Sequence, residues 1–423
     1  MGDHMKEKFS IKDPLSIYIH IPFCMKKCGY CDFLSVSAGK ERQEEYVHAL
    51  LGEIAYWGNR LESFRIKSVY FGGGTPSVLQ EELLMEILCK LRKAFPGIET
   101  RTIPEGKFGE GEPEISIEVN PGTITGKKLK AYKQAGINRL SIGLQSADNE
   151  ELKLLGRIHT YEEFLETYAE ARKQGFSNLN IDLISALPGQ KVKSWQDTLE
   201  KVLALKPEHI SAYSLMIEEG TPFYEIYYGR EGLLPDEETD RAMYALTKEM
   251  LKGAGYERYE ISNYSRKGME CRHNMVYWQR GYYLGLGLGS ASMIENIRFR
   301  NTERMEDYVN FWGSHEKAMD ESIPGEAGIP SICSRVKEVC RDIQCLTVEE
   351  QMEEFLFLGL RMIQGVSVKE FEAAFGKSIF EIYGEQIEKY KKQQMLTVSG
   401  RIALTDRGLD VSNLIFSDFL LSE

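Results

Sequence analysis

The sequence lacks several features that would assign a protein to a membrane, to secretion or to nucleic acid. No apolar run in its 423 residues reaches the ~20 positions that a membrane-spanning helix needs. The segment MGDHMKEKFS at its start lacks the apolar stretch of a secretory signal. The 52 Lys and Arg residues are outnumbered by 64 Asp and Glu, and a net charge of −12 disfavours a broad nucleic-acid-binding surface. We therefore expect a cytoplasmic protein with no transmembrane segment and no nucleic-acid partner.

The composition also lacks the signs of a disordered or disulfide-stapled chain. Hydrophobic residues make up 42% and charged residues 27%, which is ordinary for a globular protein. In a reducing compartment the eight cysteines are expected to be reduced, buried or metal-bound rather than paired. The length suits two or three domains, or one large α/β domain with an appendage.

Six apolar runs alternate with helical patterns over the first 254 residues. This alternation predicts repeated strand–helix units and a parallel sheet whose two faces are both covered. Six units are too few for a closed eight-stranded barrel, so we expect an open, partial (β/α)6 barrel with its chemistry at the carboxyl ends of the strands. The expected strands are 16–21, 67–72, 114–120, 138–145, 178–185 and 209–217, and the expected helices are 41–61, 79–95, 125–135, 161–174, 194–205 and 238–254.

The rest of the chain carries loop and turn signals. Residues 96–113 are rich in Gly, Pro and Glu and are typical of a long loop. Thr347 and Glu350 suit the capping box of a helix, and residues 395–405, MLTVSGRIALT, suit a hairpin. We expect three parts: a partial-barrel domain over 1–310 that includes the motif near 273–278, an irregular insertion or linker over 311–346, and a helical, winged-helix-like domain over 347–423.

Three cysteines, Cys24, Cys28 and Cys31, follow the first expected strand with the spacing C-x3-C-x2-C. The polar loop around them, with two lysines, argues against ordinary buried thiols. A zinc site needs four ligands, and the fourth, such as Cys89 or Cys271, would have to fold in from far along the chain. A [4Fe–4S] cluster is favoured over both, because three thiolates bind three of its irons and leave the fourth open. An open iron can chelate S-adenosylmethionine, whose reductive cleavage yields the 5'-deoxyadenosyl radical.

This spacing after a first strand resembles the radical S-adenosylmethionine superfamily. The fuller string YIHIPFC, residues 18–24, resembles the oxygen-independent coproporphyrinogen III oxidases and their relatives, the HemW-type haem chaperones. The resemblance runs through nearly the whole chain. The oxidases have a further cysteine two positions after the third, whereas this chain has Phe33, which is the chaperone-like form.

The resemblance implies an S-adenosylmethionine site along successive strand ends. The stretch FGGGTPS would hold the methionine amino group, Arg157 would pair with the methionine carboxylate, and Glu118 would accept hydrogen bonds from ribose hydroxyls. The carbonyl of Tyr30 would accept a hydrogen bond from the adenine amino group, and Met216 would pack near the adenosine. Taken singly, Gln145, Arg157 and Asp182 have the alternative interpretation of a helix cap or a surface salt bridge, and the glycine stretch that of a tight turn. The implied cofactor-binding residues are Tyr18, Tyr30, Gly72, Gly73, Gly74, Thr75, Glu118, Gln145, Arg157, Asp182 and Met216.

A second motif, His273-Asn274-x-x-Tyr277-Trp278, resembles the haem-binding H-N-x-x-Y-W string of the HemW-type proteins. A neutral imidazole is a good axial ligand for haem iron, and the aromatic residues offer flat apolar surface. The residues alone favour a packed aromatic cluster around a hydrogen-bonded histidine, while the resemblance favours haem. The family usually reads Ala-His-Ser-Tyr after the glycine at Gly289, and this chain lacks that histidine.

Two functions remain open. The first is a haem chaperone that delivers haem to respiratory haemoproteins, with the cluster and S-adenosylmethionine in a supporting or switching role. The alternative is a radical enzyme that oxidatively decarboxylates the propionates of coproporphyrinogen III, which Phe33 and the second motif disfavour; a haem-modifying methyltransferase ranks lower. The expected partners are haem-accepting apoproteins, some bound at a membrane surface, and an electron donor for the cluster. Ordinary thiols are favoured over a second cluster for Cys333, Cys340 and Cys345.

Overall fold

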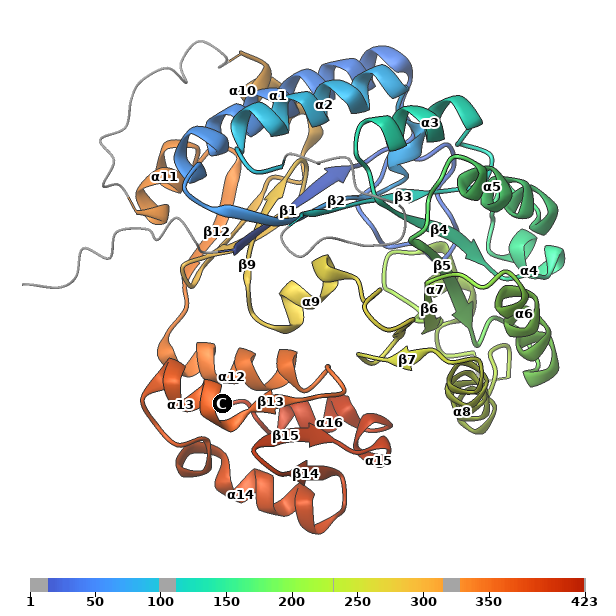
Figure 1. The fold of residues 1–423 in the computed structure, drawn as a ribbon, viewed down its shortest axis with the longest axis vertical. Helices are drawn as coiled ribbons and strands as arrows, with labels where there is room; N and C mark the ends of the chain where they lie inside the picture. The colour runs from blue at the N-terminus through green and yellow to red at the C-terminus, as the bar shows by residue number, and fades with distance from the viewer. Residues whose placement is uncertain (1–13, 99–111, 231, 315–327, 422–423) are drawn as a thin grey trace, which may run out of the picture.

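The computed structural model describes residues 14–98, 112–230, 232–314 and 328–421 of the chain (Figure 1). Within these ranges the strands form a twelve-stranded sheet and a separate three-stranded sheet near the C-terminus. Each sheet packs against its own cluster of buried apolar side chains. The chain therefore folds around two main hydrophobic cores, and the larger one belongs to the barrel.

The first six strands are the strand–helix units that the sequence predicts. They lie side by side in sequence order, and every neighbouring pair among them is parallel. Most of their residues are buried, as the near-continuous apolar runs imply. These strands are β1 (Pro14–Ile21), β2 (Arg65–Gly73), β3 (Glu114–Val119), β4 (Arg139–Gln145), β5 (Leu179–Ser185) and β6 (His209–Ser214).

Helices follow these strands and cover the outer face of the curved sheet (Figure 1). Their bounds agree with the predicted helices to within about two residues at each end, so the prediction of repeated units is confirmed. The long helices are α1 (Lys40–Leu61), α2 (Glu81–Ala94), α3 (Gly126–Gln134), α5 (Tyr161–Lys173), α6 (Val192–Ala204) and α8 (Glu237–Gly253). Short helices η1 (Pro76–Val78), α4 (Asn149–Leu154) and α7 (Pro222–Tyr227) occupy the loops at strand ends.

The sheet stays open because different strands extend its two sides. Beyond β6 it continues through β8 and β7, and beyond β1 through β9 to β12, so β1 and β6 do not meet. Strand β9 is parallel to β1, while the outer additions pair antiparallel. The prediction of a partial, open barrel is confirmed. The added strands are β7 (Glu257–Arg258), β8 (Asn263–Ser265), β9 (Tyr282–Leu286), β10 (Ala291–Ile294), β11 (Ile297–Asn301) and β12 (Cys340–Cys345).

The stretch 311–346 is more regular than expected. Its described residues include the end of α10 (Met305–Ser314), helix α11 (Ile329–Arg335) and strand β12, which pairs with β11 at the edge of the large sheet. The expectation of an irregular linker is wrong for these residues. Residues 315–327, like most of the expected loop at 96–113, lie outside the described residues. The three domain boundaries stay a prediction.

The C-terminal part has the order of elements expected for a winged-helix-like unit. Strands β14 and β15 form the predicted hairpin, and β13 pairs with β15. The capping box is confirmed, since Thr347 accepts from the Glu350 amide (3.2 Å) and Glu350 accepts from that of Thr347 (2.7 Å). Its elements are α12 (Val348–Gly359), β13 (Val366–Ser367), α13 (Val368–Phe375), α14 (Ile379–Lys392), β14 (Leu396–Val398), β15 (Arg401–Leu404), α15 (Asp406–Leu409) and α16 (Ser412–Ser417).

Helix α9 (Arg272–Trp278) lies between the barrel and this C-terminal part (Figure 1). It contacts β2 and β9 of the barrel on one side and α12 on the other. Glu354 of α12 adds a second connection, because it forms salt bridges with Arg280 (3.0 Å) and with Arg298. Every helix in the described ranges is too short or too polar to cross a bilayer.

Candidate functional site

The three-cysteine loop leaves the sheet at the carboxyl end of β1 and is closed at its base by backbone hydrogen bonds. The amide of Cys24 donates to the carbonyl of Val36 (3.0 Å), and the amide of Val36 donates to that of Pro22 (2.7 Å). At the tip, Gly29 donates to the backbone just after α4 (3.3 Å) and accepts from an amide of α7 (2.9 Å). The loop is therefore closed on itself at its base and bound to two other parts of the barrel at its tip, which fixes the positions of its thiols.

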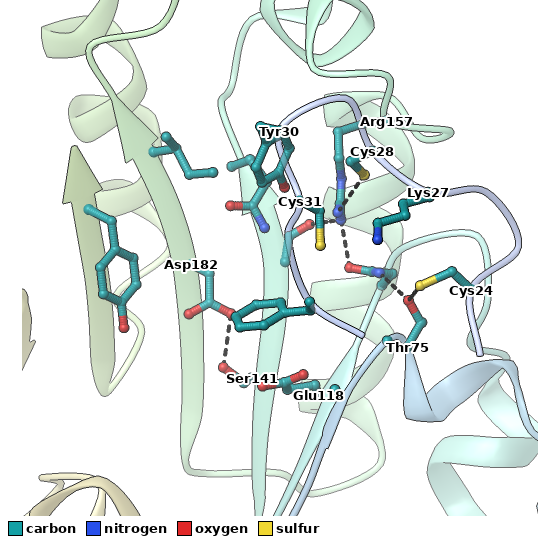
Figure 2. Close-up of a pocket in the computed structure, with 18 of the residues that line it drawn as sticks. Cys24, Lys27, Cys28, Tyr30, Cys31, Thr75, Glu118, Ser141, Arg157 and Asp182 are labelled. Atoms are coloured by element: carbon teal, nitrogen blue, oxygen red, sulfur yellow. Dashed lines mark hydrogen bonds between the residues drawn. The ribbon is translucent and has the colours of Figure 1, made fainter. Parts of the chain in front are cut away.

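A chain of polar contacts connects two of the cysteines across the strand ends (Figure 2). Cys24 Sγ lies 3.6 Å from Thr75 Oγ1, which accepts from Asn120 Nδ2 (2.8 Å). Asn120 Oδ1 accepts from Arg157 Nη2 (2.6 Å), and Arg157 Nη1 points at Cys28 Sγ (3.7 Å). The loop after β1 and the ends of β2 and β3 thus meet at the guanidinium of one arginine.

The donor set fits an iron–sulfur cluster. Cys24, Cys28 and Cys31 carry free thiols, are partly buried and line one cavity. Burial raises the pKa of the Cys31 thiol, and the backbone amide of Phe33 and the charge of Lys27 oppose that shift. No three Cys, His, Asp or Glu side chains in the described ranges are placed to share one metal ion, and a cubane does not require it, since each thiolate binds a different iron.

The glycine stretch at the end of β2 is needed for close packing against β1. Gly73 has a φ of +112°, and a Cβ there would lie 2.6 Å from the ring of His20. A Cβ on Gly74 would lie 2.7 Å from the carbonyl oxygen of Phe23, while the Thr75 amide donates to that same carbonyl (2.7 Å). The tight approach of two strands, rather than a ligand alone, explains these glycines, and their backbone still forms one wall of the cavity.

Two carboxyl groups face the cavity from neighbouring parts of the sheet. Glu118 accepts from the Tyr70 hydroxyl (2.9 Å), and Asp182 accepts from Ser141 (2.9 Å) and from Asn180 Nδ2 (2.7 Å). Burial raises the pKa of Glu118 to about 8, with the charge of Asp182 as the next cause, and burial also raises the pKa of Asp182. Near neutral pH Glu118 is therefore largely protonated and can donate as well as accept a hydrogen bond.

The cavity that these groups surround has a volume of about 420 Å³ and lies at the carboxyl ends of the barrel strands. It brings together most residues that the sequence singled out. Tyr18 and Gly72 are not part of its wall: the Tyr18 hydroxyl bonds His20 Nδ1 (3.1 Å) and its ring packs on Tyr70. The predicted residues that line the cavity are Cys24, Cys28, Cys31, Tyr30, Gly73, Gly74, Thr75, Glu118, Gln145, Arg157, Asp182, Met216 and Asn274.

The second motif lies on α9, at the far end of this cavity. His273 is buried: its Nδ1 pairs with the Ser68 hydroxyl (2.9 Å), its Nε2 pairs with the Tyr277 hydroxyl (2.9 Å), and its ring stacks on Tyr70 at 5.0 Å. Burial, followed by the charge of Arg139, lowers the pKa of His273 to about 3, so the ring is neutral. Both nitrogens are occupied in this conformation, which is the arrangement of a packed aromatic cluster.

The other members of the motif divide between the cavity and the C-terminal part. Trp278 packs under the guanidinium of Arg361, whose Cζ lies 4.5 Å from the ring centre. Asn274, by contrast, faces the cavity. Haem ligation by His273 stays a prediction, and it requires the ring to leave two hydrogen bonds.

Several polar residues of the cavity wall are not among those that the sequence motifs predict. They stand at alternate positions of strands β4, β5 and β6, so that one face of each strand points inward. The available signal was this alternation of polar residues inside otherwise apolar runs. The missed residues are Arg139, Ser141, Asn180, Ser211 and Tyr213.

Comparisons with known proteins agree with this architecture. The family model of the radical SAM superfamily matches residues 18–202, and that of the HemN C-terminal domain matches residues 346–411. The heme chaperone HemW of Lactococcus lactis is 34% identical over 98% of this chain and 99% of its own length, and that of Bacillus subtilis is 32% identical over 96% and 99%. The solved structure of Escherichia coli coproporphyrinogen III oxidase (HemN) superposes with a TM-score of 0.77 at 22% identity, over 97% of this chain and 91% of that one, which shows a shared fold.

Proposed function

Since the chain belongs to the HemW family of radical SAM proteins, we propose that it is a haem chaperone, which binds haem and delivers it to respiratory haemoproteins. The near full-length similarity to curated heme chaperones carries this proposal. Membership of the radical SAM superfamily implies a [4Fe–4S] cluster and S-adenosylmethionine. Haem would be the cargo rather than a resident cofactor.

The cluster is proposed to bind at Cys24, Cys28 and Cys31. When bound, it supplies an electron that can break a C–S bond of S-adenosylmethionine. The chain's own part is to hold three thiolates on a loop anchored at base and tip. Arg157 places a fixed positive charge 3.7 Å from Cys28 Sγ, beside one of the three sulfurs that would bind the cluster.

S-adenosylmethionine is proposed to lie along the strand ends beside that loop. Arg157 is oriented by Asn120 and by the carbonyl of Gly143 (2.7 Å), which leaves part of its planar fork for the methionine carboxylate. Glu118, held by Tyr70, is placed to bond ribose hydroxyls. The other proposed contacts are Tyr18, Tyr30, Gly72, Gly73, Gly74, Thr75, Gln145, Asp182 and Met216.

The proposed partners follow from the same function. They are haem-accepting apoproteins, including acceptors bound to a membrane that the chain would touch only at the surface, and an electron donor that reduces the cluster. We propose that the chain works in the cytoplasm. His273, Asn274, Tyr277 and Trp278 are proposed to take part in haem binding, and the buried position of His273 makes its own role the first to test.

One experiment separates the chaperone from the alternative, a coproporphyrinogen III oxidase. Reconstituted protein is incubated without oxygen with reductant, S-adenosylmethionine and coproporphyrinogen III, and the porphyrins are separated by chromatography. A parallel haem titration follows the Soret band. Haem binding without porphyrinogen conversion supports the chaperone. Multiple-turnover formation of protoporphyrinogen would favour the oxidase.

A further inference from the structure

We propose that the floor of the cavity is a carboxylate-binding site, in which the guanidinium of Arg139 pairs with a carboxylate of a bound ligand. Arg139 begins β4 and lines the cavity. Gly143, whose carbonyl binds Arg157, is four positions further along the same strand, a distance of about 13 Å at ~3.3 Å per residue. The site is therefore separate from the arginine at the cluster loop.

The main observation is a buried positive charge without a hydrogen-bond acceptor. Arg139 is only 1% exposed, and its Nε has no hydrogen-bond partner. Among the described residues its guanidinium forms neither a hydrogen bond nor a salt bridge with any side chain. A guanidinium carries five N–H donors, and burying them unpaired is costly. A ligand with a planar anionic group would satisfy them with two parallel hydrogen bonds.

The nearby carboxyl groups of the chain do not fill that role. The carboxylate of Glu114 is hydrogen-bonded to the start of α9, since it accepts from the amides of Arg272 (3.1 Å) and His273 (3.3 Å). Glu118 is held by a tyrosine hydroxyl, and Asp182 by a serine and an asparagine. These groups offset the charge of the arginine through space but leave its donors free.

Asn274 supplies a second polar group of the same floor. Its side chain lines the cavity, and its side-chain amide makes no hydrogen bond with any described residue. Asn180, on the neighbouring wall, is by contrast fully used: its Nδ2 donates to Ser141 (2.7 Å) and Asp182, and its Oδ1 pairs with His209 Nδ1 (2.6 Å). Arg139 and Asn274 are thus the donors at the floor that remain for a ligand.

This placement gives the H-N-x-x-Y-W string a structural role: His273 packs the helix onto the barrel, and Asn274 meets the ligand. A carboxylate could come from a haem propionate, an assignment that rests on the proposed function, or from the amino-acid part of S-adenosylmethionine. Both sources present the same chemistry to the arginine. Titration with each ligand and with its form that lacks a free carboxylate separates them.

The test measures ligand affinity of the cluster-containing protein by titration. The ligands are haem, haem dimethyl ester, S-adenosylmethionine and its decarboxylated form. For the ligand that uses the site, Arg139→Met is expected to lower the affinity for the acid form about tenfold or more. The affinity for the form without a free carboxylate should stay unchanged. Asn274→Ala should act in the same direction with a smaller effect, and Arg139→Lys should restore part of the affinity, because it keeps the charge without the fork.

Thermal unfolding distinguishes ligand binding from a structural role. Arg172 is the matched control, since it is partly buried and paired with Glu208 (2.8 Å). Arg172→Met should lower the melting temperature because it leaves Glu208 unpaired, whereas Arg139→Met should lower it less, because it breaks no hydrogen bond or salt bridge within the described residues. Unchanged affinity for every ligand, or equal losses for acid and ester, overturns the proposal. If wild-type protein binds no haem, the proposed function fails. The comparison of S-adenosylmethionine with its decarboxylated form then still shows whether Arg139 binds a carboxylate.

Discussion

Arg157 and Cys28 lie 129 positions apart in the chain, yet Nη1 of the arginine is 3.7 Å from Sγ of the cysteine. The contact exists because successive parallel strands end at one edge of the sheet, so loops from distant parts of the sequence converge there. The same guanidinium bonds the end of β3 and a carbonyl of β4. One side chain therefore contacts both the cysteine loop and the strand ends, so the proposed cluster site and the proposed cofactor site share this arginine.

The cluster assignment predicts a fixed iron content. Anaerobic reconstitution should give about four irons and four sulfides per chain, and Cys28→Ala should abolish them because a thiolate ligand is lost. Iron and sulfide analysis with the visible absorption spectrum measures both. The control replaces Cys333, Cys340 and Cys345 together and should leave the iron content unchanged. A Cys28→Ala protein that keeps a full, S-adenosylmethionine-responsive cluster would contradict the assignment.

The strand-end residues predict a selective loss of cofactor affinity. Arg157→Ala removes a charge-assisted hydrogen bond, at a cost of about 1.5–3 kcal/mol, which corresponds to a tenfold or larger rise in Kd. Glu118→Gln replaces a largely protonated carboxyl by an amide, so it should raise Kd in the same direction by the smaller cost of a neutral hydrogen bond, about 0.5–1.5 kcal/mol. Calorimetry with S-adenosylmethionine measures the affinity, and the iron content shows whether the cluster still assembles. Lys153, exposed on α4, offers a control through Lys153→Ala. Unchanged affinity in both test variants would place the cofactor elsewhere.

Glu53 predicts a pH dependence of stability that is independent of the cavity. This fully buried carboxyl accepts from the Gly287 amide (2.8 Å), Asn301 (2.6 Å) and Tyr308 (2.6 Å), and burial raises its pKa to about 7. Because the folded-state pKa lies above that of the unfolded chain, the native state binds more protons in this range. The free energy of unfolding should therefore fall by about 3 kcal/mol as the pH rises from about 4.5 to about 7.

Urea unfolding of the protein at several pH values checks this dependence. Glu53→Gln lacks the titrating group, so its unfolding free energy should start lower, because the amide cannot accept all three hydrogen bonds, and should change less with pH. Glu306→Gln, on the surface beside Arg42, is the control and should keep the wild-type slope. A wild-type slope in Glu53→Gln would mean that other groups cause the pH dependence.

The sequence predicts the barrel well because its strands and helices carry strong local patterns. The helices and five of the six apolar runs are found within about two residues, and the capping box of Thr347 is found as well, whereas the sixth strand ends at Ser214, three residues before its predicted end. Strand β12, CRDIQC, was missed because its side chains are mostly exposed and only its backbone pairing with β11 makes it a strand. Helix α9 has seven residues, which is too short for a periodic pattern.

The site was predictable to the extent that its residues follow strands directly. The cysteines, Glu118 and Arg157 stand at strand ends or in the loops after them, where parallel folds place their chemistry. Arg139 was not predictable as a site residue, because it is the first residue of an apolar run. Nothing in the sequence says whether its side chain points outward to solvent or into the barrel. That distinction depends on tertiary packing alone.

The burial of His273 and its two hydrogen bonds predict how its replacement affects stability and haem binding. His273→Ala removes a packed ring and two hydrogen bonds, so it should lower the free energy of unfolding by about 2–4 kcal/mol. If the ring also leaves its pocket to bind haem iron, the same change should diminish the Soret shift on haem titration. Ser68→Ala is the matched control: it frees Nδ1 while keeping the imidazole, so it should cost some stability and leave haem binding intact or stronger. A His273→Ala protein that is destabilised yet shows the full Soret shift would make His273 a packing residue and move the axial ligand to another side chain.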